Sequence, residues 1–231
     1  MATVYLIPNY LAENAKETIP AYILTAMADC QVIFAENERT VRRFLKSMDP
    51  SFPIDIYEWH TIHKAEQEVM SDFCDRLKAK KNIAIVSEAG CPGVADPGQL
   101  LVEAAQKMNV TVKPLVGPSS ILLALMASGL NGQSFEFLGY LPIDNGERIK
   151  KIKELESSSQ KNQSTKIFIE TPYRNNQLLD GLLQHCQPGT KICIGKNITG
   201  TDESIVTRTV SAWKKEKPEL HKVPVIFLLQ A

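Results

Sequence analysis

The stretch from residue 82 to residue 98 constrains the fold most. Ile83–Val86 is an unbroken apolar run, short and rich in β-branched side chains, which predicts a strand buried on both faces. Residues 87–98 then hold three glycines and two prolines, and residues 99–105 predict a helix. Strand, glycine-rich loop and helix in this order indicate a βα turn at the carboxyl end of a parallel sheet, where open α/β folds bind their ligands. This loop is the first candidate binding site.

The segments around this turn extend the α/β pattern through the first half of the chain. Apolar runs predict strands, and apolar residues at helical spacing predict the helices between them. The expected strands are Thr3–Ile7, 31–35, 54–57 and 110–116, and the expected helices are 19–28, one ending at Met48, and 62–80. This alternation predicts a parallel sheet.

The second half of the chain has a different pattern. Its strands look alternating or edge-like, which predicts a mixed or antiparallel sheet. From Phe135 onward we expect strands at 135–138, 166–170, 191–195, 205–210 and 223–229, helices only at 146–157 and 175–186, and a polar surface loop at 157–163. The helix at 121–127 is apolar all round and is expected to be buried.

These patterns together predict a two-domain α/β protein. The boundary is expected at Val116, Gly117 and Pro118, which gives an N-terminal α/β domain at 1–116 and a C-terminal domain with a mixed sheet at 117–231. A ligand at the carboxyl end of the first sheet is then expected in the cleft between the two halves.

Composition excludes several protein classes. The chain has 231 residues, of which 44% are hydrophobic and 23% charged, as in an ordinary globular enzyme. Lys plus Arg and Asp plus Glu both number 26, so no overall charge draws the protein to nucleic acid. Five cysteines without a CxxC pair argue against a disulfide framework or a structural zinc site. The longest apolar stretch, 121–127, is too short to span a bilayer, and the N-terminus lacks a signal-peptide pattern, so we expect a cytoplasmic protein without membrane contact.

Two clusters of polar side chains allow alternative interpretations. His60 and His63 are three residues apart and can share a metal if they lie on a helix, but no third ligand group is evident, so we expect no metal site. Arg39, Arg42, Arg43 and Lys46 lie at three- and four-residue spacing on an expected helix. They form either a solvated helix face or a patch that contacts phosphates.

The sequences of the glycine-rich loops argue against some classes of ligand. None fits GxGxxG or GxxxxGK[ST], which disfavours dinucleotide binding and a P-loop NTPase. A nucleoside ligand without a polyphosphate asks instead for backbone hydrogen-bonding groups, a carboxyl or hydroxyl for a ribose, and small residues. Residues 87–98, Ser119, Ser120 and the turn at 170–173 supply these types.

Several of these segments, in this order, resemble the tetrapyrrole (corrin/porphyrin) methylase superfamily. The matching segments are IVSEAGCP at 85–92 with DPG at 96–98, PLVGP at 114–118, ASGL at 127–130, GYLP at 139–142, AE at 35–36 with Arg39, and ETPYR at 170–174. Within the superfamily the chain is most similar to the ribosomal small-subunit RNA (cytidine-2′-O) methyltransferase family. The resemblance runs from about Val4 to Leu229.

The resemblance implies an S-adenosylmethionine-dependent methyltransferase that forms a homodimer and acts on RNA of the small ribosomal subunit. The implied S-adenosylmethionine contacts are Pro8, Glu88, Cys91, Asp96, Ser119, Ser120, Ile169 and Pro172. Glu36 and Arg39 are the candidate catalytic residues, with Glu36 as the base. Arg174 and Asn197 are the candidate substrate contacts.

The departures from the family pattern concern the acceptor side. Residues 8–14 read PNYLAEN where the family has PTPIGNL, so a glycine that lets a ligand approach the backbone is lost. Glu88 replaces the usual Asp, and the segments 196–200 and 221–224 also depart. Two alternatives therefore stay open: a tetrapyrrole acceptor, or a non-catalytic relative that binds S-adenosylmethionine.

Overall fold

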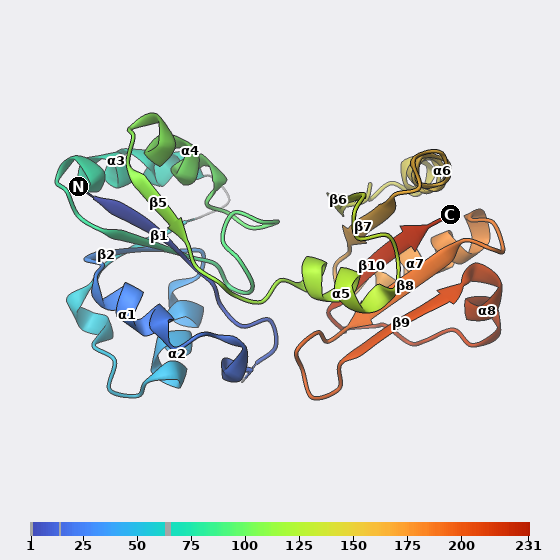
Figure 1. Cartoon of the computed structure of the whole chain (residues 1–231), viewed down its shortest axis with the longest axis horizontal. Helices are drawn as coiled ribbons and strands as arrows, with labels where there is room; N and C mark the ends of the chain where they lie inside the picture. Colours follow the sequence, from blue (N-terminus) through green and yellow to red (C-terminus); the bar gives the residue numbers. More distant parts are fainter. Residues whose placement is uncertain (1, 14, 63–65) are drawn as a thin grey trace. The chain divides into compact units, whose positions relative to one another are not determined.

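The computed structural model describes residues 2–13, 15–62 and 66–231. The chain forms two compact units, Met1–Ser119 and Ser120–Ala231 (Figure 1). Each unit contains one five-stranded sheet. The boundary expected at Val116, Gly117 and Pro118 lies shortly before the division between Ser119 and Ser120.

The sheet of the first unit is entirely parallel, as predicted, with the strand order β3-β2-β4-β1-β5. Its strands are β1 (Thr3–Ile7), β2 (Val32–Ala35), β3 (Glu58–Thr61), β4 (Ile83–Val86) and β5 (Thr111–Pro114). All four residues of β4 are buried. The predicted central strand is therefore confirmed, and it lies between β1 and β2.

Helices cover both faces of this sheet and make a three-layer unit. These helices are α1 (Tyr22–Ala28), α2 (Glu38–Met48), α3 (Met70–Lys78) and α4 (Gln99–Lys107). Successive strand residues point to opposite faces. Ala84 therefore packs with the core of α1 and α2, whereas Ile83 and Ile85 pack with the core of α3 and α4.

The sheet of the second unit is mixed, as predicted, with the order β6-β7-β10-β8-β9. Only β6 and β7 run parallel within it. Its strands are β6 (Phe135–Tyr140), β7 (Thr165–Ile169), β8 (Lys191–Lys196), β9 (Ser204–Thr209) and β10 (Val225–Gln230).

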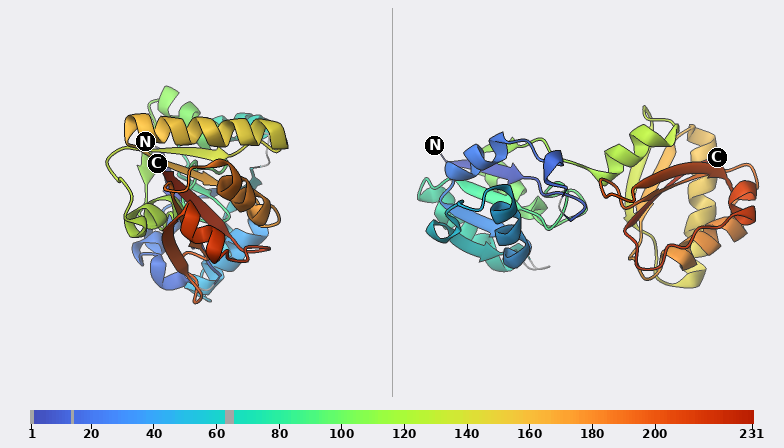
Figure 2. Two further views of the ribbon diagram at one scale, coloured as in Figure 1. Left: turned by 90° about the vertical axis from the view of Figure 1, so that its right-hand side faces the viewer. Right: turned by 90° about the horizontal axis from the view of Figure 1, so that it is seen from below.

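Helices α6 (Asn145–Asn162), α7 (Asn175–His185) and α8 (Val210–Lys215) enclose one apolar core with this sheet. Figure 2 shows the long α6 beside the sheet. Helix α5 (Ser120–Ser128) lies on the other face, where Ala124 approaches Gly195 and Ile226 is close to the same glycine.

Several predicted elements were wrong in kind or extent. Residues 54–57 do not form a strand: Ile54–Ile56 is a 3-10 helix, and β3 begins at Glu58. Strand β3 lies at the sheet edge with half-buried residues, so its sequence lacks the apolar run of a central strand. The long helix predicted at 62–80 is shorter, because Glu66–Val69 is a 3-10 helix and α3 begins only at Met70.

Two predictions in the second unit also need correction. Residues 157–163 were expected to be a loop, but α6 continues to Asn162 because Leu155 and Ser159 bury its inner side. Helix α8 was not predicted. It follows a Thr209 cap and buries Val210 and Trp213.

Helix α5 is not buried all round, contrary to the prediction. Its Ala124, Leu125 and Ser128 are buried, whereas Leu122 is 52% and Met126 is 79% exposed. Because the helix is apolar on all sides, its sequence does not show which face the sheet leaves uncovered. No helix in the described ranges is both long and apolar enough to cross a membrane.

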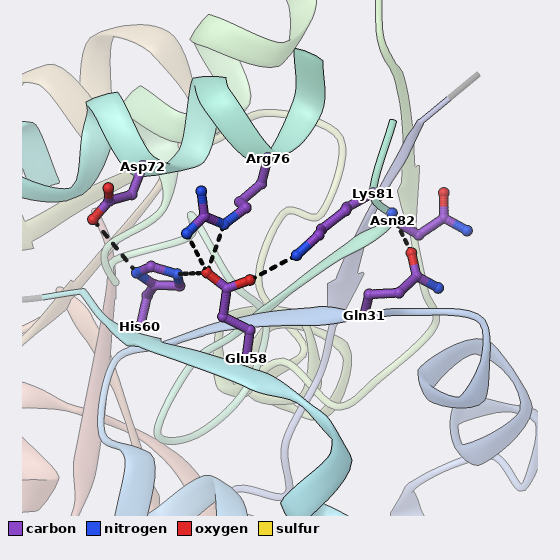
Figure 3. A network of polar contacts seen from close by, with 7 residues as sticks. All are labelled: Gln31, Glu58, His60, Asp72, Arg76, Lys81 and Asn82. Atoms are coloured by element: carbon purple, nitrogen blue, oxygen red, sulfur yellow. Dashed lines mark hydrogen bonds and ion pairs between the residues drawn. The ribbon is translucent and has the colours of Figure 1, made fainter. Parts of the chain in front are cut away.

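A charged network secures the edge strand β3 to α3 (Figure 3). The Glu58 carboxylate accepts hydrogen bonds from Arg76 at 2.5 Å and from Lys81 at 2.9 Å. His60 Nε2 lies 3.0 Å from Glu58 Oε1, and its Nδ1 lies 3.7 Å from Asp72. These charges on an edge strand also disfavour pairing with another chain.

Candidate functional site

The loop after β4 is held against the end of β1 by Asn9. This residue is fully buried, and its backbone exchanges hydrogen bonds with Gly90 at 2.9 and 3.0 Å. Its side-chain Nδ2 donates to the Ser87 carbonyl at 3.3 Å and to the Glu88 carbonyl at 2.8 Å. Gly90 has a φ of 69°, which a residue with a side chain rarely adopts. Asn9 was not among the predicted site residues, although a polar residue two positions after a buried strand was the available signal.

The loop after β1 also packs closely against the end of the first unit, at Pro8 and Gly117. A Cβ on Gly117 would lie 2.1 Å from the Pro8 Cβ, so only glycine fits there. Pro8 itself is buried. The Cys91 thiol donates to the Pro118 carbonyl at 3.5 Å. The predicted residues Pro8 and Cys91 thus both contact the 117–118 segment.

Glu36, the candidate base, hydrogen-bonds to the loop after β4. It follows β2, and its carboxylate accepts a hydrogen bond from the Glu88 backbone N–H at 2.9 Å. Burial raises the pKa of Glu36, and the Glu88 N–H partly offsets this rise. Thr40 in the first turn of α2 donates to Glu88 Oε1 at 3.3 Å. Helix α2 and the loop are therefore linked through Glu88.

Asp96 is the most perturbed carboxyl group of the loop. Burial, followed by repulsion from Glu36 and Glu88, raises its pKa to about 7. Burial also raises the pKa of the nearby Cys91 thiol, with a smaller contribution from Asp96. Three carboxylates that repel one another favour a cationic ligand, because a positive charge relieves their repulsion. S-adenosylmethionine carries a sulfonium and an ammonium, so these residues fit it.

The other predicted donor contacts lie around the unit boundary and in the second unit. Ser119 ends the first unit, and Ser120 begins α5. Ile169 is the last residue of β7, and the Pro172 carbonyl accepts a hydrogen bond from the Lys222 N–H at 2.9 Å.

The predicted substrate residue Arg174 is paired with Glu170. The Arg174 Nη2 lies 2.6 Å from Glu170 Oε1, and the Thr171 N–H donates to the same oxygen at 2.6 Å. Glu170 Oε2 is buried and has no hydrogen-bond partner among the described residues. The buried carboxylate therefore retains one free acceptor beside Arg174.

Asn197 and Arg39 are the remaining two candidates. Asn197 follows β8 with a φ of 48°, and its Nδ2 donates to Asp202 at 2.6 Å. Arg39 lies exposed on α2. His63, one of the two histidines considered for a metal, lies outside the described residues, and within them no cluster of three His, Cys, Asp or Glu side chains suits a metal ion.

A family model for Tetrapyrrole (Corrin/Porphyrin) Methylases matches residues 16–213. The chain belongs to this family. The resemblance found in the sequence and the two-domain α/β fold are thereby confirmed.

Two of the similar curated proteins carry the same name. The chain is 31% identical over 209 residues to a ribosomal RNA small subunit methyltransferase I of Mesorhizobium japonicum. The aligned residues make up 90% of this chain and 68% of the relative. It is 30% identical to the protein of that name from Bacillus subtilis, over 94% of this chain and 71% of the relative.

Solved structures share the fold. The methyltransferase CobJ aligns with a TM-score of 0.65 and 18% identity, over 99% of this chain and 93% of that one. A uroporphyrin-III C-methyltransferase from Thermus thermophilus, crystallised with S-adenosylhomocysteine, aligns with a TM-score of 0.57 and 14% identity, over 100% of this chain and 97% of that one. At these identities the likeness concerns the fold alone.

Proposed function

We propose that this protein, by its family an S-adenosylmethionine-dependent methyltransferase, methylates a ribose 2′-hydroxyl in RNA of the small ribosomal subunit. The observation that carries the proposal is the similarity along 90% of the chain to a relative named for that RNA. The sequence segments that resemble the cytidine-2′-O family support the choice of a ribose hydroxyl.

The donor site of this proposal is centred on the loop after β4. Its residues are Pro8, Glu88, Cys91, Asp96, Ser119, Ser120, Ile169 and Pro172. In this proposal the carboxylates of Glu88 and Asp96 offset the positive charge of the donor. Asn9 holds the loop in position through its bonds to the Ser87 and Glu88 carbonyls. When bound, S-adenosylmethionine supplies an activated methyl group, so the protein has mainly to align the acceptor and accept a proton.

The proton from the ribose hydroxyl is assigned to Glu36. Burial raises the pKa of this carboxyl, which makes it a better proton acceptor than an ordinary glutamate. Arg39, in the first turn of α2, is assigned to positioning the acceptor. In the second unit, Arg174 and Asn197 are assigned to the RNA.

The experiment is methyl transfer to small ribosomal subunits purified from a strain that lacks the gene. With radiolabelled S-adenosylmethionine, we expect label at one nucleotide whose 3′ linkage resists alkaline hydrolysis, because a 2′-O-methyl blocks that cleavage. Donor binding is followed in parallel by calorimetry with S-adenosylhomocysteine. Heat of binding without label on the RNA contradicts the RNA proposal, and label on a base rather than a ribose contradicts the 2′-hydroxyl.

A tetrapyrrole acceptor is the second candidate, since the solved structures with this fold include uroporphyrin-III C-methyltransferases. The same labelled donor, incubated with uroporphyrinogen III, tests it. Label in the tetrapyrrole and none in the ribosomal subunit favours this second candidate. Donor binding with label in neither favours a non-catalytic relative.

The proposal includes a cytoplasmic homodimer. Exposed apolar side chains in the second unit support a partner surface: Leu122 and Met126 on α5, and Phe135 and Tyr140 on β6. Light scattering at rising protein concentration tests the assembly. A monomeric mass at every concentration contradicts the dimer.

A further inference from the structure

The basic face of α2 lines a cavity on the first unit. Four basic side chains lie on this helix, each three or four residues from at least one other: Arg39, Arg42, Arg43 and Lys46. Together with Glu38 and Ile54 they line a cavity of about 570 Å³. Four basic side chains and one acid are a local excess of positive charge in a chain whose net charge is zero.

The Arg42 side chain is already engaged in contacts with other residues of the first unit. Its Nε donates to Glu38 at 2.8 Å, its Nη1 donates to Asp55 at 3.3 Å, and its guanidinium lies 4.3 Å from the centre of the Trp59 ring. Arg42 therefore neutralises the acid of the cavity wall. The positive charge available to a ligand comes from its neighbours.

Arg39 and Arg43 supply that charge. Arg39 is exposed and makes no ion pair within the part of the chain that the structure describes. The Arg43 side chain is 65% exposed, and its Nη1 lies 3.9 Å from Glu13, beyond hydrogen-bonding distance. The two side chains are four residues apart and so lie one turn from each other on the same face of the helix.

Arg43 also belongs to a second cavity, which reaches the loop after β4. This cavity, of about 540 Å³, is lined by Tyr10, Leu11, Glu13, Thr40, Arg43, Ser47, Glu88 and Ala89. The shared Arg43 makes the two cavities neighbours. We call the pair the α2 groove, and it leads from the basic face of α2 to Glu88 in the proposed donor loop.

We propose that the α2 groove binds the phosphodiester backbone of an RNA, with Arg39 and Arg43 as its phosphate contacts. This proposal rests on the proposed function. Arginine matches a phosphate with two parallel N–H donors, and its charge persists at every physiological pH. A chain with zero net charge has no overall field that attracts RNA, so its affinity has to come from such a local set. An RNA held here lies beside the loop that we assign to the methyl donor.

The test is the salt dependence of RNA binding by the whole protein. The probe is a fluorescein-labelled single-stranded RNA of mixed sequence, because phosphate contacts carry no sequence information. Fluorescence anisotropy gives the binding constant over a series of salt concentrations for the wild type and for the double variant Arg39→Gln/Arg43→Gln. Each lost phosphate contact on a single strand lowers the slope of log K against log salt by about 0.7, so we expect a decrease of about 1.4.

A matched control removes the same charge elsewhere. Lys150 and Lys153 are exposed on α6 in the second unit, and the double variant Lys150→Gln/Lys153→Gln is expected to keep the wild-type slope. Both double variants are expected to keep the wild-type melting temperature and affinity for S-adenosylhomocysteine. A lower slope in the α2 variant alone supports the proposal.

Three outcomes overturn it. An unchanged slope in the α2 variant, or an equal decrease in the α6 control, removes the α2 groove as the phosphate site. If the wild type still labels the small subunit in either case, the proposed function stands and only the groove fails. A wild type that neither binds the RNA probe nor labels the subunit overturns both proposals together.

Discussion

At the scale of single residues, Asp96 is the carboxyl group of the loop whose ionisation costs the folded protein the most free energy. Its pKa of about 7 means that ionising this carboxyl at neutral pH costs free energy in the folded protein. In the unfolded chain the same carboxyl ionises without this cost. Such perturbed groups cluster at functional sites, where a ligand compensates them. The donor cation proposed here is such a compensation.

Replacing this carboxyl should stabilise the free protein in a pH-dependent way. Because the folded pKa lies above the ordinary value of 3.8, the penalty begins above that pH, grows to about pH 7 and is then constant. We expect Asp96→Asn to raise the free energy of unfolding by about 1 to 3 kcal/mol more at pH 8 than at pH 5, since one pKa unit is worth about 1.4 kcal/mol. Urea denaturation at both pH values measures it.

The control for this prediction is Glu17→Gln, which removes an exposed carboxylate from the same unit. It should change stability little at either pH. An equal gain from Asp96→Asn at pH 5 and pH 8 would show that its ionisation is not the cause.

Gly117 gives a second prediction at this scale. Alanine places its Cβ 2.1 Å from the Pro8 Cβ, so the first loop or the 117–118 segment has to shift. We expect Gly117→Ala to cost about 1 to 3 kcal/mol of stability, as overpacking usually does. Gly132→Ala, where no atom lies within 4 Å of the added Cβ, is the matched control. Thermal melting compares them, and equal melting temperatures would contradict the clash.

At the scale of elements, the loop after β4 is tied to two neighbouring strand ends. Asn9 after β1 and Glu36 after β2 each hydrogen-bond to this loop. The sequence predicts β4 and its loop because an apolar run followed by glycines and prolines is a local signal. It does not predict that Asn9 is buried under the loop, because that depends on which strands become neighbours.

The edge strand β3 shows a different case, since charged contacts add to its pairing with β2. The side-chain hydrogen bond from Lys81 is the largest cause that lowers the pKa of Glu58 to about 2, and His60 and Arg76 add to it (Figure 3). A carboxyl with a lowered folded pKa contributes stability above its unfolded pKa and loses that contribution as the pH falls toward the folded value.

We therefore expect Glu58→Gln to destabilise the protein at pH 7 and to have a smaller effect at pH 3. The pH window follows from the ordinary value of 4.5 and the lowered value of about 2. The side chain is 30% exposed, so solvent screening limits the loss at pH 7 to about 1 kcal/mol. Urea denaturation at the two pH values measures it, and a loss that is the same at pH 3 would assign the effect to packing instead.

At the scale of the whole molecule, each unit has its own hydrophobic core. The cluster around Phe168 lies entirely within 120–231, and the clusters on the two faces of the first sheet lie within 1–119. Phe168 is fully buried and stacks on Phe227 with ring centres 6.1 Å apart. Phe44 is the equivalent large buried side chain in the first unit.

A truncation in one core should loosen the unit that contains it. We expect Phe168→Ala to cost about 3 to 5 kcal/mol and to speed amide hydrogen exchange in peptides from 120–231. Phe44→Ala, as the matched variant, should act on peptides from 1–119. Hydrogen exchange by mass spectrometry measures both. Equal loss of protection across the whole chain in either variant would contradict separate cores.

The sequence alone predicted the parallel first sheet, the mixed second sheet and the loop after β4, because strand burial and turn chemistry leave local patterns. The methylase family was also recognisable from the order of short motifs. The sequence did not predict the edge strand β3 correctly, because its half-buried residues carry no apolar run. It also did not predict the exposed face of α5, because the exposed Met126 is as apolar as the buried Leu125.

The tertiary structure decided how the site residues act on one another. Only the folded sheet places Asn9 under the loop after β4, brings Glu36 to the Glu88 N–H and crowds Asp96 with two other carboxylates. It also places Arg43 where the two cavities of the α2 groove meet. The physical reason is that hydrogen bonds and charge repulsion depend on distances of a few ångströms between residues far apart in the chain, which no local pattern encodes.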